Sequence, residues 1–345
     1  MLYIHIPFCD TKCPYCSFNS FVGKKELENS YLKALIEDFK KDIDRYEKKE
    51  FKTVYIGGGT PSVLSPSFYE ALFKHLEPYT KNTKEITIEA NPNSFNQEFA
   101  KTLLALGVKR VSFGIQSLDK KKLSLLGRKH SKKEALNAIE LAQKTGFERL
   151  SADLIYGVRG DSFELLKNDL DELLKRDIEH ISAYALSIEK GSAFFSKPYM
   201  SVNSCRFGEF IKSTLQSNGL RHYEVSNYGK TPSLHNRNYW RQKEYIGIGA
   251  GAVGFVGKSR ITKQKVVEKY IQNQSQEVET LSSDELRFER LFMGLRSDIG
   301  VSHDDIIRKD RLNILEKEGR VFVYRDRVFC SDFFLADEVV LFLEK

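Results

Sequence analysis

Three cysteines lie within eight positions near the start of the chain, and their type and spacing predict a metal cluster. Cys9, Cys13 and Cys16 form the pattern CxxxCxxC. Core packing does not explain three thiols this close together, whereas thiolates are the usual ligands of iron–sulfur clusters. A zinc site normally takes four ligands from paired motifs, and the sequence has no second cysteine pair or cysteine–histidine pair. We therefore predict a four-iron cluster with three cysteine ligands and one iron open to an outside ligand.

The elements that must position these cysteines alternate between strand and helix patterns. Six runs predict strands, at Leu2–Ile6, Thr53–Ile56, Glu85–Glu89, Arg110–Ile115, Leu150–Ile155 and Ile181–Leu186. The segments between them carry apolar residues at helical spacing, as at Leu32, Leu35, Ile36, Phe39 and Ile43. Six strands alternating with helices predict a parallel sheet, either doubly wound or curved into a barrel.

Residues able to bind a ligand gather where the predicted strands end. Cys9–Cys16 follow the first strand and Gly57–Pro61 the second, Glu89 ends the third, Gln116 follows the fourth and Asp153 lies in the fifth. A barrel of parallel strands builds its active site at this rim. Successive glycines let a backbone approach a ligand closely, although a tight turn is the alternative explanation of Gly57–Gly59.

The rest of the chain predicts a second, smaller unit. The alternation loosens beyond about residue 190. We predict a barrel with an extension over residues 1–260, a polar connecting segment over 261–280 and a small helical domain over 281–345. Val321–Tyr324 and Val328–Cys330 flank a turn and predict a hairpin, so this domain is expected to be winged-helix-like.

Composition and charge predict a cytoplasmic protein. Hydrophobic residues make up 41% and charged residues 29%, as in ordinary globular proteins, and no apolar run is long enough to span a membrane. The N-terminus lacks the pattern of a signal peptide. The net charge of +7 comes from scattered lysines without interleaved aromatics, so we expect no nucleic-acid partner. Cys205 and Cys330 stand alone and predict incidental thiols.

The cysteine pattern, with Tyr15 before its last cysteine, resembles the radical S-adenosylmethionine (SAM) superfamily. The resemblance implies a partial (β/α)6 barrel and a [4Fe-4S] cluster whose open iron is chelated by SAM. YIHIPFC, GGGTPS, IEANP, SFGIQS, LGRKHS and DLIYG occur in the order seen in oxygen-independent coproporphyrinogen oxidases and their HemW relatives. By that resemblance the SAM pocket would be lined by Tyr3, Tyr15, Gly58, Gly59, Thr60, Glu89, Gln116, Arg128, Asp153 and Ala185.

Two features favour the haem chaperone branch, HemW, over the oxidases. Ser17 follows Cys16 where the oxidases have a further cysteine, and only eight residues precede Cys9. The run His235–Trp240, HNRNYW, resembles the HNxxYW motif of that branch. The resemblance implies haem contacts by His235, Tyr239 and Trp240, because imidazole can ligate haem iron and aromatic rings can pack on the macrocycle. A hydrogen-bonded structural histidine is the alternative.

The expected function is therefore binding of haem and its transfer to acceptor proteins, with membrane-bound respiratory enzymes as candidate acceptors and a separate electron donor for the cluster. Two alternatives stay open. One is an oxygen-independent coproporphyrinogen III oxidase, and the other is a radical SAM enzyme with another substrate, in which HNRNYW is structural. One position departs from the resemblance, because Val253 stands where histidine is usual.

Overall fold

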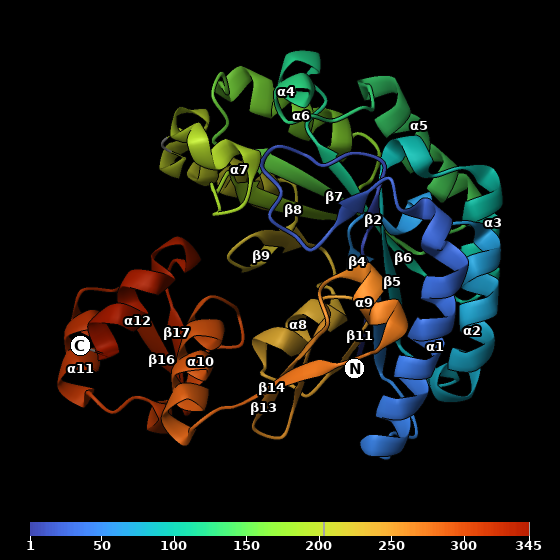
Figure 1. Cartoon of the computed structure of the whole chain (residues 1–345). Coiled ribbons are helices and arrows are strands. Elements are labelled where there is room, and N and C mark those ends of the chain that lie inside the picture. Colours follow the sequence, from blue (N-terminus) through green and yellow to red (C-terminus); the bar gives the residue numbers. More distant parts are fainter. Residues whose placement is uncertain (203, 345) are drawn as a thin grey trace.

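The computed structural model of the chain describes residues 1–202 and 204–344 (Figure 1). Its centre is a curved sheet in which six neighbouring strands run parallel: β1 (Leu2–Ile6), β4 (Thr53–Gly58), β5 (Glu85–Ala90), β6 (Arg110–Gln116), β7 (Arg149–Tyr156) and β8 (His180–Ala185). The strand β11 (Ile246–Ile248) joins β1 in parallel. A hairpin of β9 (Arg221–Glu224) and β10 (Asn227–Gly229) extends the other end. The predicted α/β fold with a partial (β/α)6 barrel is confirmed.

The six parallel strands alternate between apolar and polar residues, and this alternation decides what each face of the sheet does. One set of side chains is apolar and packs with the helices: Leu2, Ile4, Ile6, Val54, Ile56, Ile86, Ile88, Val111, Phe113, Leu150, Ala152, Leu154, Ile181 and Ala183. The alternate positions carry polar side chains, including Tyr55, Glu89, Ser112, Asp153 and Tyr184. Because successive strand residues point to opposite faces, the concave face is polar.

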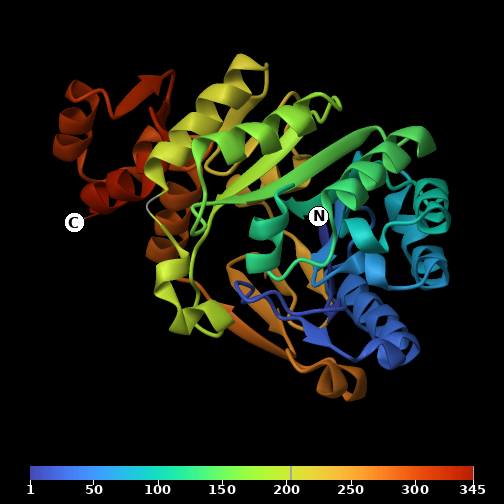
Figure 2. The ribbon, with the colours of Figure 1, turned by 90° about the horizontal axis from the view of Figure 1, so that it is seen from above.

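Seven helices among the described residues connect or follow these strands: α1 (Glu28–Arg45), α2 (Pro66–Thr80), α3 (Gln97–Ala105), α4 (Lys120–Leu125), α5 (Lys132–Thr145), α6 (Phe163–Leu174) and α7 (Cys205–Ser217). Apart from the short α4, these helices cover the convex side of the sheet, as the view from above shows (Figure 2). Local sequence sets their ends. For example, Ser131 and Glu134 form a capping box at the start of α5, and Gly146 ends that helix with φ +104°.

Residues 261–280, which the sequence predicts as a connecting segment, contain regular secondary structure. They contribute to a sheet of β12 (Val253–Val256), β13 (Ser259–Lys263) and β14 (Gln276–Thr280), and they form α9 (Val267–Gln272), which contacts α1. The Lys263 ammonium is buried and lies 2.6 Å from Asp38 and 2.7 Å from Asp42, both on α1. The charge of Lys263 is neutralised by these two partners, which lie more than 200 positions away in the sequence. The polar composition of the segment alone could not indicate this burial.

The C-terminal part has a hydrophobic cluster of its own, built from residues between 291 and 343. It consists of α10 (Ser283–Leu295), α11 (Lys309–Lys317), α12 (Ala336–Glu344) and a small sheet of β15 (Val301–Ser302), β16 (Val321–Tyr324) and β17 (Arg327–Cys330). Residue 345, which ends the predicted domain, lies outside the described residues.

This C-terminal part packs against the free edge of β9 (Figure 1). The Val225 N–H donates to the Arg296 carbonyl at 2.9 Å, and the Asp298 N–H donates to the Tyr223 carbonyl at 2.8 Å. These bonds cover the edge strand, which would otherwise expose unpaired backbone groups. No helix in the described part of the chain combines the length and the apolar character needed to cross a membrane.

Candidate functional site

The cysteine loop leaves the carboxyl end of β1 and closes through a short parallel pairing of β2 (Phe8–Cys9) with β3 (Phe21–Val22) (Figure 1). Cys9, Cys13 and Cys16 are each half-buried, and all three line one cavity of about 390 Å³. Among the described residues, no three His, Cys, Asp or Glu side chains converge as they would around a single metal ion. Thiols placed around a cavity suit a multi-iron cluster better than one ion.

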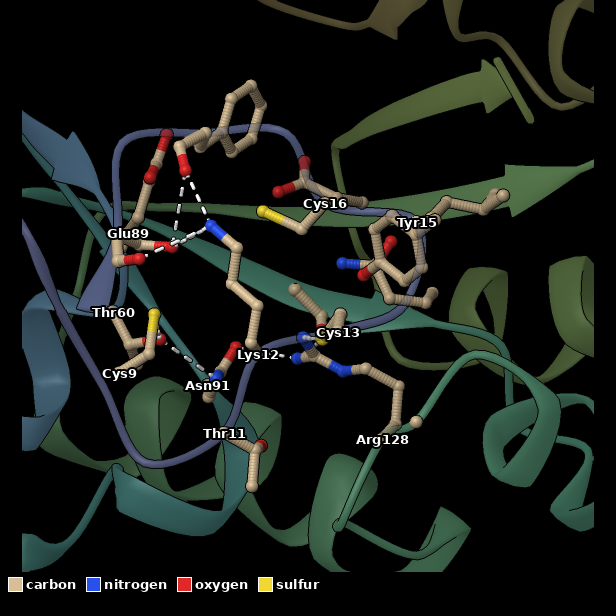
Figure 3. A pocket seen from close by; sticks show the side chains of 18 of the residues that line it. Cys9, Thr11, Lys12, Cys13, Tyr15, Cys16, Thr60, Glu89, Asn91 and Arg128 are labelled. Atoms are coloured by element: carbon tan, nitrogen blue, oxygen red, sulfur yellow. Dashed lines mark hydrogen bonds between the residues drawn. The ribbon is translucent and has the colours of Figure 1, made fainter. Parts of the chain in front are cut away.

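Hydrogen-bond donors and a cation lie close to two of the three sulfurs. Burial raises the pKa of the Cys9 thiol, and hydrogen bonds from Thr60 and Ser20 oppose that rise. The Thr60 hydroxyl lies 3.4 Å from Cys9 Sγ, and the Arg128 guanidinium lies 3.6 Å from Cys13 Sγ (Figure 3). Because hydroxyl donors and a neighbouring cation stabilise thiolates, these residues fit a cluster bound at the three sulfurs.

The glycine run after β4 is needed to bring that strand's end against the cysteine loop. Gly58 has φ +114°, and a Cβ there would lie 2.5 Å from the His5 ring. A Cβ on Gly59 would lie 2.7 Å from the Phe8 carbonyl oxygen, and the Gly59 N–H donates to the Ile6 carbonyl at 2.7 Å. Both glycines line the cavity, but their close packing on the loop already accounts for the absence of a side chain.

Two half-buried carboxylates of the cavity, Glu89 and Asp153, have neutral hydrogen-bond partners. Glu89 accepts hydrogen bonds from the Tyr55 hydroxyl at 2.8 Å and from the Gly58 N–H at 3.1 Å, while Asp153 accepts from the Ser112 hydroxyl at 3.2 Å. Burial, with a smaller contribution from the charge of Asp153, raises the pKa of Glu89 to about 7. Burial also raises the pKa of Asp153. A cationic ligand in the cavity would favour the ionised form of both acids.

Gln116 and Arg128 also line the cavity. Gln116 has φ +64° at an irregularity in the pairing of β6 with β7, a conformation that costs energy in a residue other than glycine and is typical of functional positions. Arg128 donates to Asn91 Oδ1 and to the Gly114 carbonyl, both at 2.6 Å, and its buried Nε has no hydrogen-bond partner among the described residues. Arg128 therefore braces the cavity beside Cys13.

The structure brings nearly all the residues predicted for cluster and SAM binding to this cavity. Its lining includes Cys9, Cys13, Tyr15, Cys16, Gly58, Gly59, Thr60, Glu89, Gln116, Arg128, Asp153 and Ala185. Tyr3 is absent from the lining residues in the described part of the chain, and its hydroxyl instead lies 2.9 Å from His5 Nδ1. Val253 lies in β12 and pairs with Thr262, outside that lining.

Lys12 and Asn91 are among the cavity residues that sequence reasoning missed. Both stand inside motifs that it identified, Lys12 in CxxxCxxC and Asn91 in IEANP. Asn91 accepts a hydrogen bond from Arg128 at 2.6 Å and donates to the Thr60 hydroxyl at 3.2 Å, so it links two residues that approach the thiols (Figure 3). A polar residue directly after a predicted strand was the available signal.

The HNRNYW motif forms a separate region at the opposite edge of the sheet, on the helix α8 (Leu234–Trp240) (Figure 1). The Glu85 carboxylate, at the start of β5, accepts hydrogen bonds from the Leu234 N–H at 3.1 Å and from the His235 N–H at 3.0 Å. At the other end of the helix, Arg237 forms an ion pair with Asp298 of the C-terminal part. The helix therefore connects the amino-terminal edge of the sheet to the C-terminal part.

His235 is engaged within this region and faces away from solvent. It is 0% exposed; its Nδ1 lies 2.8 Å from the Thr53 hydroxyl and its Nε2 lies 2.9 Å from the Tyr239 hydroxyl. Burial lowers the pKa of His235 to about 3. Among the described residues, His235, Tyr239 and Trp240 are all outside the lining of the cysteine cavity. Both ring nitrogens have hydroxyl partners in this conformation, so ligation of haem iron by His235, as predicted, would require one of these hydrogen bonds to break.

Comparisons with known proteins agree on one family. The model of the radical SAM superfamily matches residues 3–173. The chain is 33% identical over 318 residues to the protein named heme chaperone HemW of Bacillus subtilis. The alignment covers 87% of this chain and 84% of that protein. It is 38% identical over 264 residues to heme chaperone HemW of Escherichia coli, covering 74% and 70%.

The fold is similar to a solved structure, coproporphyrinogen III oxidase (HemN) from Escherichia coli, described as a radical SAM enzyme. The TM-score is 0.84, and the match covers 100% of this chain and 89% of that one. The two sequences are 20% identical, so this likeness concerns the fold alone.

Proposed function

Since the chain belongs to the HemW family of the radical SAM superfamily, we propose that it is a haem chaperone, which binds haem and transfers it to an acceptor protein. The observation that carries this proposal is the likeness to heme chaperones over most of both chains. Haem-accepting proteins, with membrane-bound respiratory enzymes as the first class to test, are the proposed recipients. A separate electron donor would reduce the cluster.

The cysteine cavity is the proposed site of a [4Fe-4S] cluster and SAM. Cys9, Cys13 and Cys16 would hold the cluster, and the two acids with neutral partners, Glu89 and Asp153, would bind the cationic parts of SAM. Thr60, whose hydroxyl lies 3.4 Å from Cys9 Sγ, also lines the cavity and would add a further polar contact to the ligand. When bound, the cluster supplies one-electron chemistry at the SAM sulfonium.

The mouth of the same cavity offers apolar surface for the haem macrocycle. Phe18 is 68% exposed and Tyr184 is 43% exposed, and both line the cavity. Exposed aromatic rings can pack on a porphyrin, and burying one contributes roughly 1.5–3 kcal/mol. We therefore propose that haem is bound at this mouth, and that His235, Tyr239 and Trp240 support the fold instead of contacting haem.

Two assays on anaerobically reconstituted protein test the function. Titration with haemin should give saturable binding with a Soret band, and the loaded protein should pass haem to an acceptor in its haem-free form. Incubation with coproporphyrinogen III, SAM and a reductant should yield no protoporphyrinogen. A protein that fails to bind haemin, or that decarboxylates coproporphyrinogen, would contradict the chaperone proposal, and the second result would support the oxidase alternative.

A further inference from the structure

Lys12, between the first two cysteines, crosses the cysteine loop and binds its far side. Its ammonium donates to the Phe18 carbonyl at 2.6 Å, to the Ser20 hydroxyl at 2.8 Å and to the Ser20 carbonyl at 3.3 Å. The dashed lines at Lys12 in Figure 3 mark these bonds. One flexible side chain thus joins the segment before Cys13 to the segment after Cys16.

The backbone of the loop explains why such a link matters. The Phe21 N–H donates to the Pro7 carbonyl at 2.7 Å and closes the base of the loop, and the Cys16 N–H donates to the Cys13 carbonyl at 3.0 Å in its centre. Apart from β2 and β3 at its base, the described loop contains turns and bends without helix or strand. Charge-assisted hydrogen bonds to two carbonyls are therefore well placed to limit its movement.

Ser20 extends the influence of Lys12 to the first cysteine. Its hydroxyl accepts from the Lys12 ammonium and also lies within hydrogen-bonding reach of the Cys9 thiol. The hydroxyl itself donates to the Phe18 carbonyl at 3.5 Å, so Lys12, Ser20 and Phe18 form one hydrogen-bonded group beside Cys9. Lys12 thereby holds a hydroxyl near Cys9 while it holds the loop.

We propose that Lys12 is a positioning residue, a clasp that fixes the cysteine loop in a cluster-accepting shape before iron arrives and places a positive charge beside the cluster afterwards. The second half rests on the proposed [4Fe-4S] cluster, whereas the first half concerns the cluster-free chain. A cation near the cluster stabilises its reduced, more negative state, so it raises the reduction potential.

The first test uses the cluster-free full chain. Lys12→Met should increase the hydrogen-exchange rate of amides in residues 13–20 by roughly tenfold, because it removes bonds to a charged group. Lys129→Met is the matched control, since Lys129 is exposed on the same cavity and its loss changes the charge equally. Ser20→Ala, which keeps the ammonium and removes one of its partners, should give a smaller increase. Unchanged exchange in Lys12→Met would overturn the clasp.

The second test uses reconstituted protein. Lys12→Met should lose iron to a chelator faster than the parent and should show a more negative midpoint potential in an EPR-monitored titration. Lys12→Arg should keep the potential close to that of the parent, because it retains the charge. Equal iron loss and equal potential in Lys12→Met and the parent would overturn the second half. Failure of the parent chain itself to take up iron and sulfide would instead count against the proposed function, and the exchange experiment would still decide the first half.

Discussion

The carboxyl-terminal ends of the parallel strands (the carboxyl edge) and their amino-terminal ends (the amino edge) both carry polar residues. The two sets differ in whether the protein itself neutralises and hydrogen-bonds them. At the carboxyl edge, Glu89 and Asp153 are half-buried with neutral hydrogen-bond partners, and the pKa of each is raised. At the amino edge, Glu85 receives hydrogen bonds from α8 and an ion pair from Arg149, and His235 has a partner at both ring nitrogens. Polar groups whose charge is not matched by the protein mark a ligand site, whereas fully matched groups hold the fold together.

The same difference in hydrogen bonding distinguishes two motifs that both looked like ligand sites in the sequence. CxxxCxxC surrounds a cavity, while HNRNYW fills the space between the sheet and the C-terminal part. A histidine beside aromatic residues has the composition of a haem site in either case. Only the hydrogen bonds in the structure show that both nitrogens of the His235 ring already have partners.

The largest effect is expected from the cysteines at the carboxyl edge. Replacing Cys9, Cys13 or Cys16 by alanine should abolish the cluster, because a three-thiolate site cannot lose a ligand without exposing a second iron. Iron and sulfide analysis with visible absorption spectroscopy after reconstitution would measure this. Cys205→Ala is the control, since Cys205 is exposed and outside the cavity lining. A cluster of unchanged iron and sulfide content in the alanine variants would refute the assignment.

At the amino edge, His235→Ala should destabilise the fold and leave haem affinity unchanged. Removing the buried ring leaves the Thr53 and Tyr239 hydroxyls without their present partner and opens a cavity, at a cost of about 3 kcal/mol in the free energy of unfolding. Thermal unfolding and haemin titration of the same samples would measure both effects. A large loss of haem affinity with an unchanged melting temperature would restore the original interpretation of the motif.

Glu89→Gln should weaken SAM binding by roughly tenfold to a hundredfold, the cost of losing a charge-assisted hydrogen bond. Because burial raises the pKa of Glu89 to about 7, the affinity of the parent for SAM should increase as pH rises through about 7 and level off above it. Isothermal titration calorimetry across this range should give a flatter profile for the variant. A pH dependence equal to that of the parent would exclude Glu89 as the titrating group.

Glu224 provides a control for the buried acid, because burial raises its pKa to about 7 as well and it lies outside the cavity lining among the described residues. Glu224→Gln should therefore leave SAM affinity unchanged. A carboxyl group with a raised pKa binds its proton more tightly in the folded state than in the unfolded state. Its contribution to stability is thus complete below about pH 4.5 and is lost as pH rises through about 7, so the variant should lose less stability over that interval.

The smallest effect is expected at the mouth of the cavity. Phe18→Ser should weaken haemin binding by about tenfold through the loss of apolar contact, while cluster content stays unchanged. Fluorescence quenching by haemin would measure the affinity. Leu125→Ser is a matched control, because Leu125 is an exposed apolar residue outside the cavity lining. Equal affinities of the parent and the Phe18 variant would move the haem site elsewhere.

Most of the barrel could be predicted from the sequence because its strands are locally encoded. The predicted Leu2–Ile6 strand has the same bounds in the structure, and the other five differ by at most two residues at an end. The apolar residues of each strand recur at every second position, and glycines mark the turn that follows β4. The packing of residues 261–280 could not be predicted, because Lys263 and Tyr270 acquire their partners on α1, far away in the sequence.

The sequence by itself determined the α/β order, the cysteine pattern and most residues of the cavity, because strand alternation and metal-ligand spacing are local properties. Tertiary structure decided what the polar residues do. It brought Glu89 and Asp153 to one cavity, where their hydrogen-bond partners are neutral. It placed the Thr53 and Tyr239 hydroxyls within hydrogen-bonding distance of the two ring nitrogens of His235. It also placed the Lys12 ammonium on carbonyls across the cysteine loop. Hydrogen-bond satisfaction depends on residues that meet only when the chain folds, so spacing alone cannot separate a ligand site from a structural contact.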